Sequence, residues 1–166
     1  ILFWVTGLSG SGKTRISKKI SSHIRKNYGK TLVLSGDEIR NIFNMKGYSN
    51  KERLITVLKY CKLAKTITSQ HINVILAVIG MRDYLRDWNK KNQKNYVEIY
   101  IKTDLKKIIK EKKKKIYHNN TSQIVGISNI SEIPKNPHII LNNSFKKSIN
   151  QLSEVLLKRI NNLINQ

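Results

Sequence analysis

The residues with the clearest capacity for chemistry form a glycine-rich loop near the start of the chain. Gly7-Leu8-Ser9-Gly10-Ser11-Gly12-Lys13-Thr14 matches the eight-residue pattern of a phosphate-binding P-loop without a gap. Glycines permit the backbone geometry that turns several N–H groups toward phosphate oxygens, and a helix N-terminus adds partial positive charge. We expect Lys13 to act on the β- and γ-phosphates and the Thr14 hydroxyl to bind Mg²⁺. The loop therefore predicts binding of a nucleoside triphosphate.

A second residue with catalytic chemistry is an acid that follows an apolar stretch. The segment Ser35-Gly36-Asp37-Glu38-Ile39-Arg40 places Asp37 near the edge where a parallel sheet would also hold the P-loop. Small-molecule kinases keep a catalytic carboxylate there, whereas the alternative role of Asp37 is the N-cap of a helix. The chain contains neither the Asn-Lys-x-Asp tetrapeptide of GTPases nor an acid directly after the strand pattern at 73–79. The sequence therefore favours a small-molecule kinase over a GTPase or a motor-type ATPase.

Short apolar runs alternate with longer amphipathic stretches along the chain. Strands are expected at 2–6, 31–35, 73–79, 96–101 and 138–141, and helices at 13–27, 51–70, 83–92, 105–115 and 145–163. Apolar strands separated by helices indicate a parallel sheet covered on both faces. We therefore predict an α/β, three-layer P-loop kinase fold with a five-stranded parallel sheet, in which residues 1–166 form one domain. Residues 117–137 show little periodicity and are expected to form a lid-like loop.

Positive charge dominates the composition. The 166 residues include 32 Lys and Arg against 10 Asp and Glu, for a formal net charge of +22. Such a charge would suit nucleic acid or an anionic membrane surface. However, the 25 Lys, 25 Ile and 18 Asn share A/T-rich codons, so an AT-rich genome would produce the same composition, and the lysines are scattered over most helical stretches. We expect attraction of anionic metabolites and no specific nucleic acid, with a nucleic-acid-binding P-loop protein as the alternative.

Several classes of protein are excluded by the composition. No apolar run approaches the roughly 20 residues that span a bilayer. A glycine-rich loop, rather than a cleavage site, follows the apolar residues 1–5. Cys61 is the single cysteine, which excludes an internal disulfide framework and a cysteine-rich zinc site, and the four histidines lack metal-ligand spacing. The expected location is the cytoplasm, without membrane association.

Taken together, these motifs resemble the adenylylsulfate kinase family. The resemblance covers nearly the whole chain and rests on Phe3-Trp4-Val5-Thr6 with the P-loop, Leu34-Ser35-Gly36-Asp37-Glu38-Ile39-Arg40, Gly47-Tyr48-Ser49-Asn50-Lys51-Glu52-Arg53, Tyr96-Val97-Glu98-Ile99-Tyr100-Ile101, Val125-Gly126-Ile127 and Pro134-Lys135-Asn136-Pro137. Family membership implies transfer of the γ-phosphoryl group of ATP, with Mg²⁺, to the 3′-hydroxyl of a nucleotide that carries an activated 5′ group. Dimers are common in the family, so the resemblance is also compatible with a homodimer.

The resemblance assigns roles to particular acceptor-side positions. Asp37 looks like the carboxylate that orients or deprotonates the 3′-hydroxyl and helps to place Mg²⁺. Arg40 and Arg53 look like the cations that hold the acceptor phosphate, because a planar guanidinium gives bidentate hydrogen bonds. Tyr48 looks like the ring that stacks on the acceptor base, with ordinary packing as its alternative. Lys114 aligns with a family lysine, although a solvated charge run is the alternative.

Departures from the family pattern gather around the acceptor. Where the family has an acid, an Asn, an Arg and an aromatic residue, this chain has Ser35, Thr56, Leu58 and Ile124. The family's Ile-Ser-Pro-aromatic-Arg segment reads Ile79-Gly80-Met81-Arg82, which keeps Ile79 as a candidate substrate contact. Each hydrogen-bond partner lost from a buried site costs about 1–3 kcal/mol. The donor half is therefore intact, whereas the acceptor half has been rebuilt.

A rebuilt acceptor half indicates a different nucleotide. The segment at 73–79, followed by Asp87-Trp88-Asn89, resembles a divergent branch of the family found with surface-polysaccharide genes. The acceptor in that branch is cytidine diphosphoramidate, on the route to capsular O-methyl phosphoramidate. A smaller pyrimidine would suit one aromatic wall and one aliphatic wall. We expect cytidine diphosphoramidate as the acceptor, with two alternatives: an adenylylsulfate kinase, or a non-catalytic P-loop binding protein.

Overall fold

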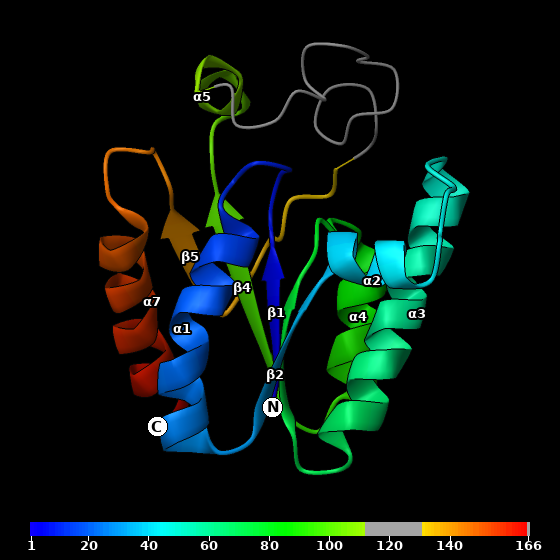
Figure 1. The fold of residues 1–166 in the computed structure, drawn as a ribbon, viewed down its shortest axis with the longest axis horizontal. Helices are drawn as coiled ribbons and strands as arrows, with labels where there is room; N and C mark the ends of the chain where they lie inside the picture. Colours follow the sequence, from blue (N-terminus) through cyan, green and yellow to red (C-terminus); the bar gives the residue numbers. More distant parts are fainter. Residues whose placement is uncertain (112–130, 166) are drawn as a thin grey trace.

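The computed structural model describes residues 1–111 and 131–165, and a five-stranded sheet lies at its centre (Figure 1). The strands are β1 (Leu2–Thr6), β2 (Thr31–Ser35), β3 (Asn73–Ala77), β4 (Tyr96–Lys102) and β5 (Ile139–Asn142). They lie in the order β2-β3-β1-β4-β5, and every neighbouring pair is parallel. The predicted five-stranded parallel sheet is confirmed, with the strand that leads into the P-loop in the middle.

Helices cover both faces of the sheet and complete three layers. They are α1 (Lys13–Tyr28), α2 (Gly36–Ile42), α3 (Asn50–Thr68), α4 (Asp83–Asn92), α5 (Leu105–Lys110) and α7 (Ile149–Ile164). Figure 1 shows α1 and α7 on one face, α2, α3 and α4 on the other, and α5 beyond the carboxyl end of β4. Within the described residues, no helix combines the length and the apolar character that crossing a membrane requires.

The burial of the central strands explains why both faces carry helices. All five residues of β1 and all five of β3 are buried, which is typical of parallel strands between two helical layers. Alternate residues of a strand point to opposite faces. Phe3 and Val5 therefore pack with α1 and α7, whereas Leu2 and Trp4 pack with α3 and α4. β1 therefore packs against both helical layers, and this packing fixes the position of the P-loop that follows it.

Most predicted elements have the expected place, and the differences fall at their ends. β1, β2 and α4 have the predicted bounds, and β3 ends two residues earlier than predicted. The last helix, expected from 145, begins at Ile149 because Phe145 has a left-handed backbone (φ 64°) and Ser148 caps the helix by accepting the Gln151 N–H at 3.2 Å. α2 was not predicted, since seven residues are too few for a clear apolar period. Residues 112–115 of the helix expected at 105–115 lie outside the described residues.

β5 begins at Ile139, one residue later than predicted, because His138 bonds through its side chain. Its Nδ1 accepts the backbone N–H of Glu98 at 2.9 Å, and its ring meets that of Tyr96 edge-on with the centroids 5.9 Å apart. An accepting Nδ1 requires a neutral ring with its proton on Nε2. Burial, and then the positive charge of Lys90, lower the pKa of His138 below its ordinary value.

Acid should therefore weaken the fold through His138. Because the folded state keeps this ring neutral, its contribution to stability is complete above the ordinary histidine pKa of 6.5 and is lost as the pH falls below that value. Between about pH 7.5 and about pH 5.5, the free energy of unfolding should fall more in the wild type than in His138→Asn, whose amide oxygen can still accept the Glu98 N–H. Denaturant unfolding at a series of pH values measures the difference. His71→Asn, the same exchange at a histidine of another segment, is the control, and identical pH profiles for the wild type and His138→Asn would contradict the assignment.

Candidate functional site

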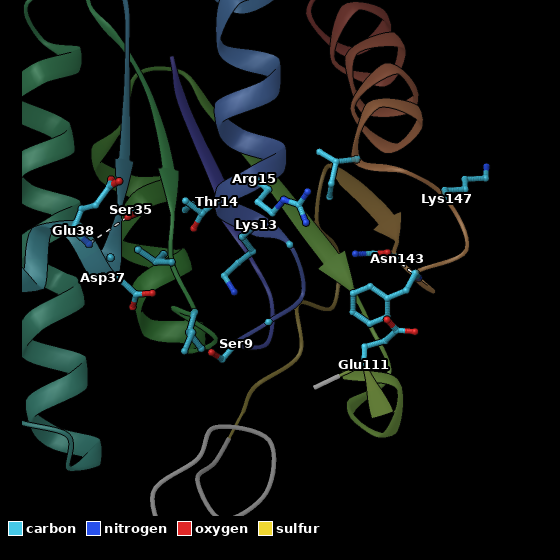
Figure 2. A pocket seen from close by; sticks show the side chains of 18 of the residues that line it. Ser9, Lys13, Thr14, Arg15, Ser35, Asp37, Glu38, Glu111, Asn143 and Lys147 are labelled. Carbon is cyan, nitrogen blue, oxygen red and sulfur yellow. Dashed lines mark hydrogen bonds between the residues drawn. The ribbon is translucent and has the colours of Figure 1, made fainter. Parts of the chain in front are cut away.

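A cavity opens at the carboxyl edge of the sheet, where the segments after several strands meet. Its volume is about 730 Å³, and Figure 2 shows it between the P-loop, the start of α2 and the segment after β5. The lining includes Ser9, Gly10, Gly12, Lys13, Thr14 and Arg15 from the P-loop and α1, Asp37 from α2, Val78 and Ile79 after β3, and Asn143, Phe145 and Lys147 after β5. Ligands of open α/β sheets bind at this edge, outside the carboxyl ends of the strands.

The P-loop is shaped by two glycines and closed by one lysine. Gly10 and Gly12 have φ values of 81° and 92°, a left-handed conformation in which any side chain would be strained. Lys13 is only 8% exposed, and its Nζ donates to the Leu8 carbonyl oxygen at 2.6 Å across the loop. The buried ammonium therefore lies inside a loop whose backbone already has the curvature that a phosphate requires.

The start of α1 is suited to an anion. Its N-cap is Gly12, which offers no side-chain hydrogen bond to the helix, and the first turn contains no acid. The partial positive charge of the helix N-terminus therefore favours a phosphate at this end. Thr14, in the first turn, lines the cavity, and its hydroxyl oxygen is a ligand of the kind that Mg²⁺ prefers. The P-loop, Lys13 and Thr14 together fit a nucleoside triphosphate with Mg²⁺.

Asp37 approaches the P-loop from the end of β2. Ser35 caps α2 by accepting the Glu38 N–H at 3.2 Å, so the alternative in which Asp37 is the N-cap is wrong. The Glu38 carboxylate is paired with Lys18 at 2.8 Å on the surface. Figure 2 shows Asp37 and Lys13 projecting into the cavity from opposite sides. The arrangement places one carboxylate opposite one ammonium across a space lined by backbone donors.

Two guanidiniums and one ring form a cluster outside the cavity lining, with Arg40 on α2, Tyr48 in the segment 43–49 and Arg53 on α3. Arg40 Cζ lies 4.7 Å and Arg53 Cζ 5.3 Å from the centre of the Tyr48 ring, within the range of cation–π contact. Arg40 Nη1 donates to the carbonyl oxygens of Met45 and Gly47, both at 2.8 Å. Burial, and then the nearby charge of Arg40, lower the pKa of Arg53 below its ordinary value. Two guanidiniums so close together favour an anion between or beside them.

The predicted site residues fall into two groups in space. Asp37, Ile79 and five residues of the P-loop line the cavity: Ser9, Gly10, Gly12, Lys13 and Thr14. The other three predicted P-loop residues, Gly7, Leu8 and Ser11, are not part of its lining. Arg40, Tyr48 and Arg53 are brought together by the structure, but they lie beside the cavity rather than in its lining. Lys114 lies outside the described residues, so its role stays a prediction.

The described part of the predicted lid-like loop is 131–137, and residues 117–130 lie outside the described residues. Glu132 fixes this part to the segment that follows Ile79. Its backbone N–H donates to the Met81 carbonyl oxygen at 2.9 Å, its carboxylate accepts the Asp83 N–H, and Oε1 lies 3.6 Å from Arg82 Nε. The end of the predicted loop is therefore fixed to the segment after β3, whose first residues form one wall of the cavity.

No sequence motif marks the cavity residues that follow β5. Asn143, Phe145 and Lys147 line the cavity, yet they belong to no motif and no recognisable charge pattern. The one available signal was their position directly after the fifth predicted strand. Because the carboxyl ends of parallel strands meet at one edge, residues at that position are candidates for ligand contact.

Comparison with known proteins assigns the family. Residues 1–142 match the sequence profile of the family described as Adenylylsulphate kinase. The chain belongs to the adenylylsulfate kinase family. It is 31% identical over 163 residues to the cytidine diphosphoramidate kinase of Campylobacter jejuni, with 96% of this chain and 95% of that protein covered. It is 28% identical over 170 residues to the adenylyl-sulfate kinase of Bacteroides thetaiotaomicron, with 96% and 85% covered.

Solved structures share the fold. The APS kinase of Mycobacterium tuberculosis in complex with AMPPNP and APS superposes with a TM-score of 0.84 at 21% identity, with 96% of each chain covered. The crystal structure of APE1195 superposes with a TM-score of 0.82 at 24% identity, over 99% of this chain and 96% of that one. The predicted P-loop kinase fold is therefore confirmed. As a member of the adenylylsulfate kinase family, the chain is a phosphotransferase that acts on a hydroxyl group with ATP and Mg²⁺.

Proposed function

We propose that this chain transfers the γ-phosphoryl group of ATP to the 3′-hydroxyl of a nucleotide with an activated 5′ group, and that the acceptor is cytidine diphosphoramidate. The main observation in support of this reaction is the cavity into which Lys13 and Asp37 project from opposite sides. The choice of acceptor is supported by 31% identity with a cytidine diphosphoramidate kinase over nearly the full length of both chains.

The donor side works by positioning and by neutralising charge. The P-loop amides and the N-terminus of α1 hold phosphate oxygens, and Lys13, which the loop already keeps buried, balances their negative charge. The Thr14 hydroxyl offers a ligand to Mg²⁺. ATP supplies the phosphoryl group, and Mg²⁺ supplies charge neutralisation when it is bound. These groups are in place before binding, so little reorganisation is needed at the moment of transfer.

Asp37 acts on the acceptor hydroxyl. Because its helix is capped by Ser35 rather than by its own side chain, the carboxylate is not required for the start of α2. In the proposed reaction Asp37 aligns the 3′-hydroxyl with the donor phosphate and takes its proton. Because Asp37 lies opposite Lys13, the acceptor hydroxyl oxygen and the leaving oxygen of ADP can lie in line on either side of the γ-phosphorus.

The acceptor's 5′ end and base are held by the cluster beside the cavity. Arg40 and Arg53 bind the acceptor phosphate, and the Tyr48 ring, 45% exposed, stacks on the base. The bonds of Arg40 to Met45 and Gly47 hold its guanidinium in place and thereby reduce the entropy lost on binding. Ile79, which lines the cavity, supplies an apolar wall to the acceptor.

Adenylylsulfate is the alternative acceptor, and an adenylyl-sulfate kinase is also among the relatives, at 28% identity. Two of the departures argue against it. Thr56 is 7% exposed within α3, and Leu58 packs against the core beneath α3. These positions serve the fold, so they do not supply the polar contacts that the family pattern implies for an adenylylsulfate acceptor.

We further propose that residues 1–166 act as one kinase domain in the cytoplasm, as a monomer or as a homodimer. Its partner is a small nucleotide, and the function requires neither nucleic acid nor a membrane. The net charge of +22 then attracts anionic nucleotides over distance and raises their rate of encounter with the cavity.

Phosphoryl transfer from Mg²⁺-ATP, followed by ³¹P NMR, tests the acceptor. Cytidine diphosphoramidate and adenylylsulfate are offered in separate tubes. We expect a 3′-phosphate on the cytidine compound with a kcat/KM at least about tenfold above that for adenylylsulfate, the ratio that one or two lost hydrogen bonds produce. The reverse preference would contradict the choice of acceptor. Transfer to neither compound would contradict the proposed reaction.

Asp37→Asn should abolish transfer without loss of the donor. An amide cannot take the hydroxyl proton, so we expect kcat to fall by about a hundredfold or more, while the Kd for ADP stays close to that of the wild type. Turnover measurements and calorimetric titration with ADP give the two quantities. Glu154→Gln is the control, because this exposed acid of α7 lies outside the cavity lining, and its turnover should stay at the wild-type level. Nearly normal turnover in Asp37→Asn would contradict the catalytic role.

A further inference from the structure

One buried asparagine links the P-loop to the segment after β5. Asn143 is 3% exposed and lines the cavity, and Figure 2 shows it beside the P-loop. Its Nδ2 donates to the Ser11 carbonyl oxygen at 3.0 Å, and its Oδ1 accepts the backbone N–H of Phe145 at 3.0 Å. Both halves of the amide are therefore bonded to backbone, on two segments that lie far apart in the sequence.

The bond to Ser11 fixes the orientation of one peptide group in the P-loop. A trans peptide is planar, so the C=O of Ser11 and the N–H of Gly12 point in opposite directions. Gly12 is the N-cap of α1, and glycine by itself places little restriction on rotation of the peptide. Asn143 holds the carbonyl on one side and thereby holds the Gly12 N–H, a donor of the phosphate loop, on the other.

The bond to Phe145 holds the second segment. Phe145 has a φ of 64°, a left-handed conformation that is uncommon for a bulky residue and needs support from its surroundings. Phe145 and Leu8 of the P-loop also pack against the same buried residue, Ile108. The P-loop and the turn after β5 therefore have a common apolar support, with the amide of Asn143 as the polar link between them.

We propose that Asn143 is a positioning residue of the donor site, which sets the direction of the Ser11–Gly12 peptide and thereby the affinity of the P-loop for the donor phosphates. The proposal rests on the proposed function in taking the P-loop as the donor site. Asn143 acts through the Gly12 N–H. An amide side chain suits this place because it donates to one backbone group and accepts from another, whereas an ionised carboxylate only accepts.

Asn143→Asp separates the two bonds. The carboxylate can still accept the Phe145 N–H, but it cannot donate to the Ser11 carbonyl oxygen. The turn at Phe145 is therefore retained, whereas the Ser11–Gly12 peptide loses the hydrogen bond that orients it. By isothermal titration calorimetry, we expect the Kd for ADP to rise about tenfold or more. The KM for the acceptor should stay close to its wild-type value. Asn143→Leu, which loses both bonds, should weaken ADP binding at least as much.

Asn142→Asp is the matched control. It places the same charge one residue earlier, on an exposed position of β5, and should leave the Kd for ADP near that of the wild type. The proposal is overturned if Asn143→Asp binds ADP as tightly as the wild type or loses no more affinity than Asn142→Asp. A loss confined to Asn143→Leu would assign the effect to the Phe145 turn and would also overturn it. A loss confined to Asn143→Asp would assign the effect to repulsion between the added charge and the phosphates, and would overturn the proposal too.

The test is independent of the acceptor. If neither acceptor is phosphorylated while the wild type still binds ADP, the proposed reaction fails and the ADP titrations still decide the role of Asn143. A wild-type chain that does not bind ADP would overturn the donor site and the role of Asn143 together.

Discussion

Parallel pairing of the five strands is the constraint on which the site depends. Because all five strands run in the same direction, their carboxyl ends lie at one edge of the sheet. The P-loop leaves β1 there, Asp37 follows β2, Ile79 follows β3 and Asn143 follows β5. A shift of one residue in the register of β1 would exchange its two buried faces, so the packing of both layers fixes the position of the P-loop.

The donor site and the proposed acceptor site are built by different means. The donor side depends on backbone groups, a helix N-terminus and one buried lysine, so few substitutions are compatible with it. In the proposed function, the acceptor is held by the side chains of Arg40 on α2, Tyr48 between the helices and Arg53 on α3. Side chains of that kind can change without disturbing the sheet. Acceptor choice can therefore vary within one family, while the phosphate-binding loop and the fold stay the same.

The layers, the sheet and the P-loop could be predicted from the sequence because each rests on a strong local pattern. Continuous apolar strands, amphipathic helices and an eight-residue loop need no knowledge of tertiary contacts. The start of α7 could not be predicted in this way, since it depends on the left-handed backbone of Phe145 that Asn143 supports. The role of Ser35 was also hidden, because its capping bond becomes visible only when the end of β2 is seen to lead directly into α2. Asn143 is one of 18 asparagines, and only the fold distinguishes it.

Separate donor and acceptor sites lead to a direct prediction for amide hydrogen exchange. We would measure exchange along the whole chain without ligand, then with Mg²⁺-ADP, and then with cytidine diphosphoramidate added. Mg²⁺-ADP should slow exchange at residues 7–14 and at the turn after β5, and exchange at residues 40–53 should slow only when the acceptor is added. Slower exchange at 40–53 with Mg²⁺-ADP alone, or no change at 7–14, would contradict the separation of the donor site from the acceptor site.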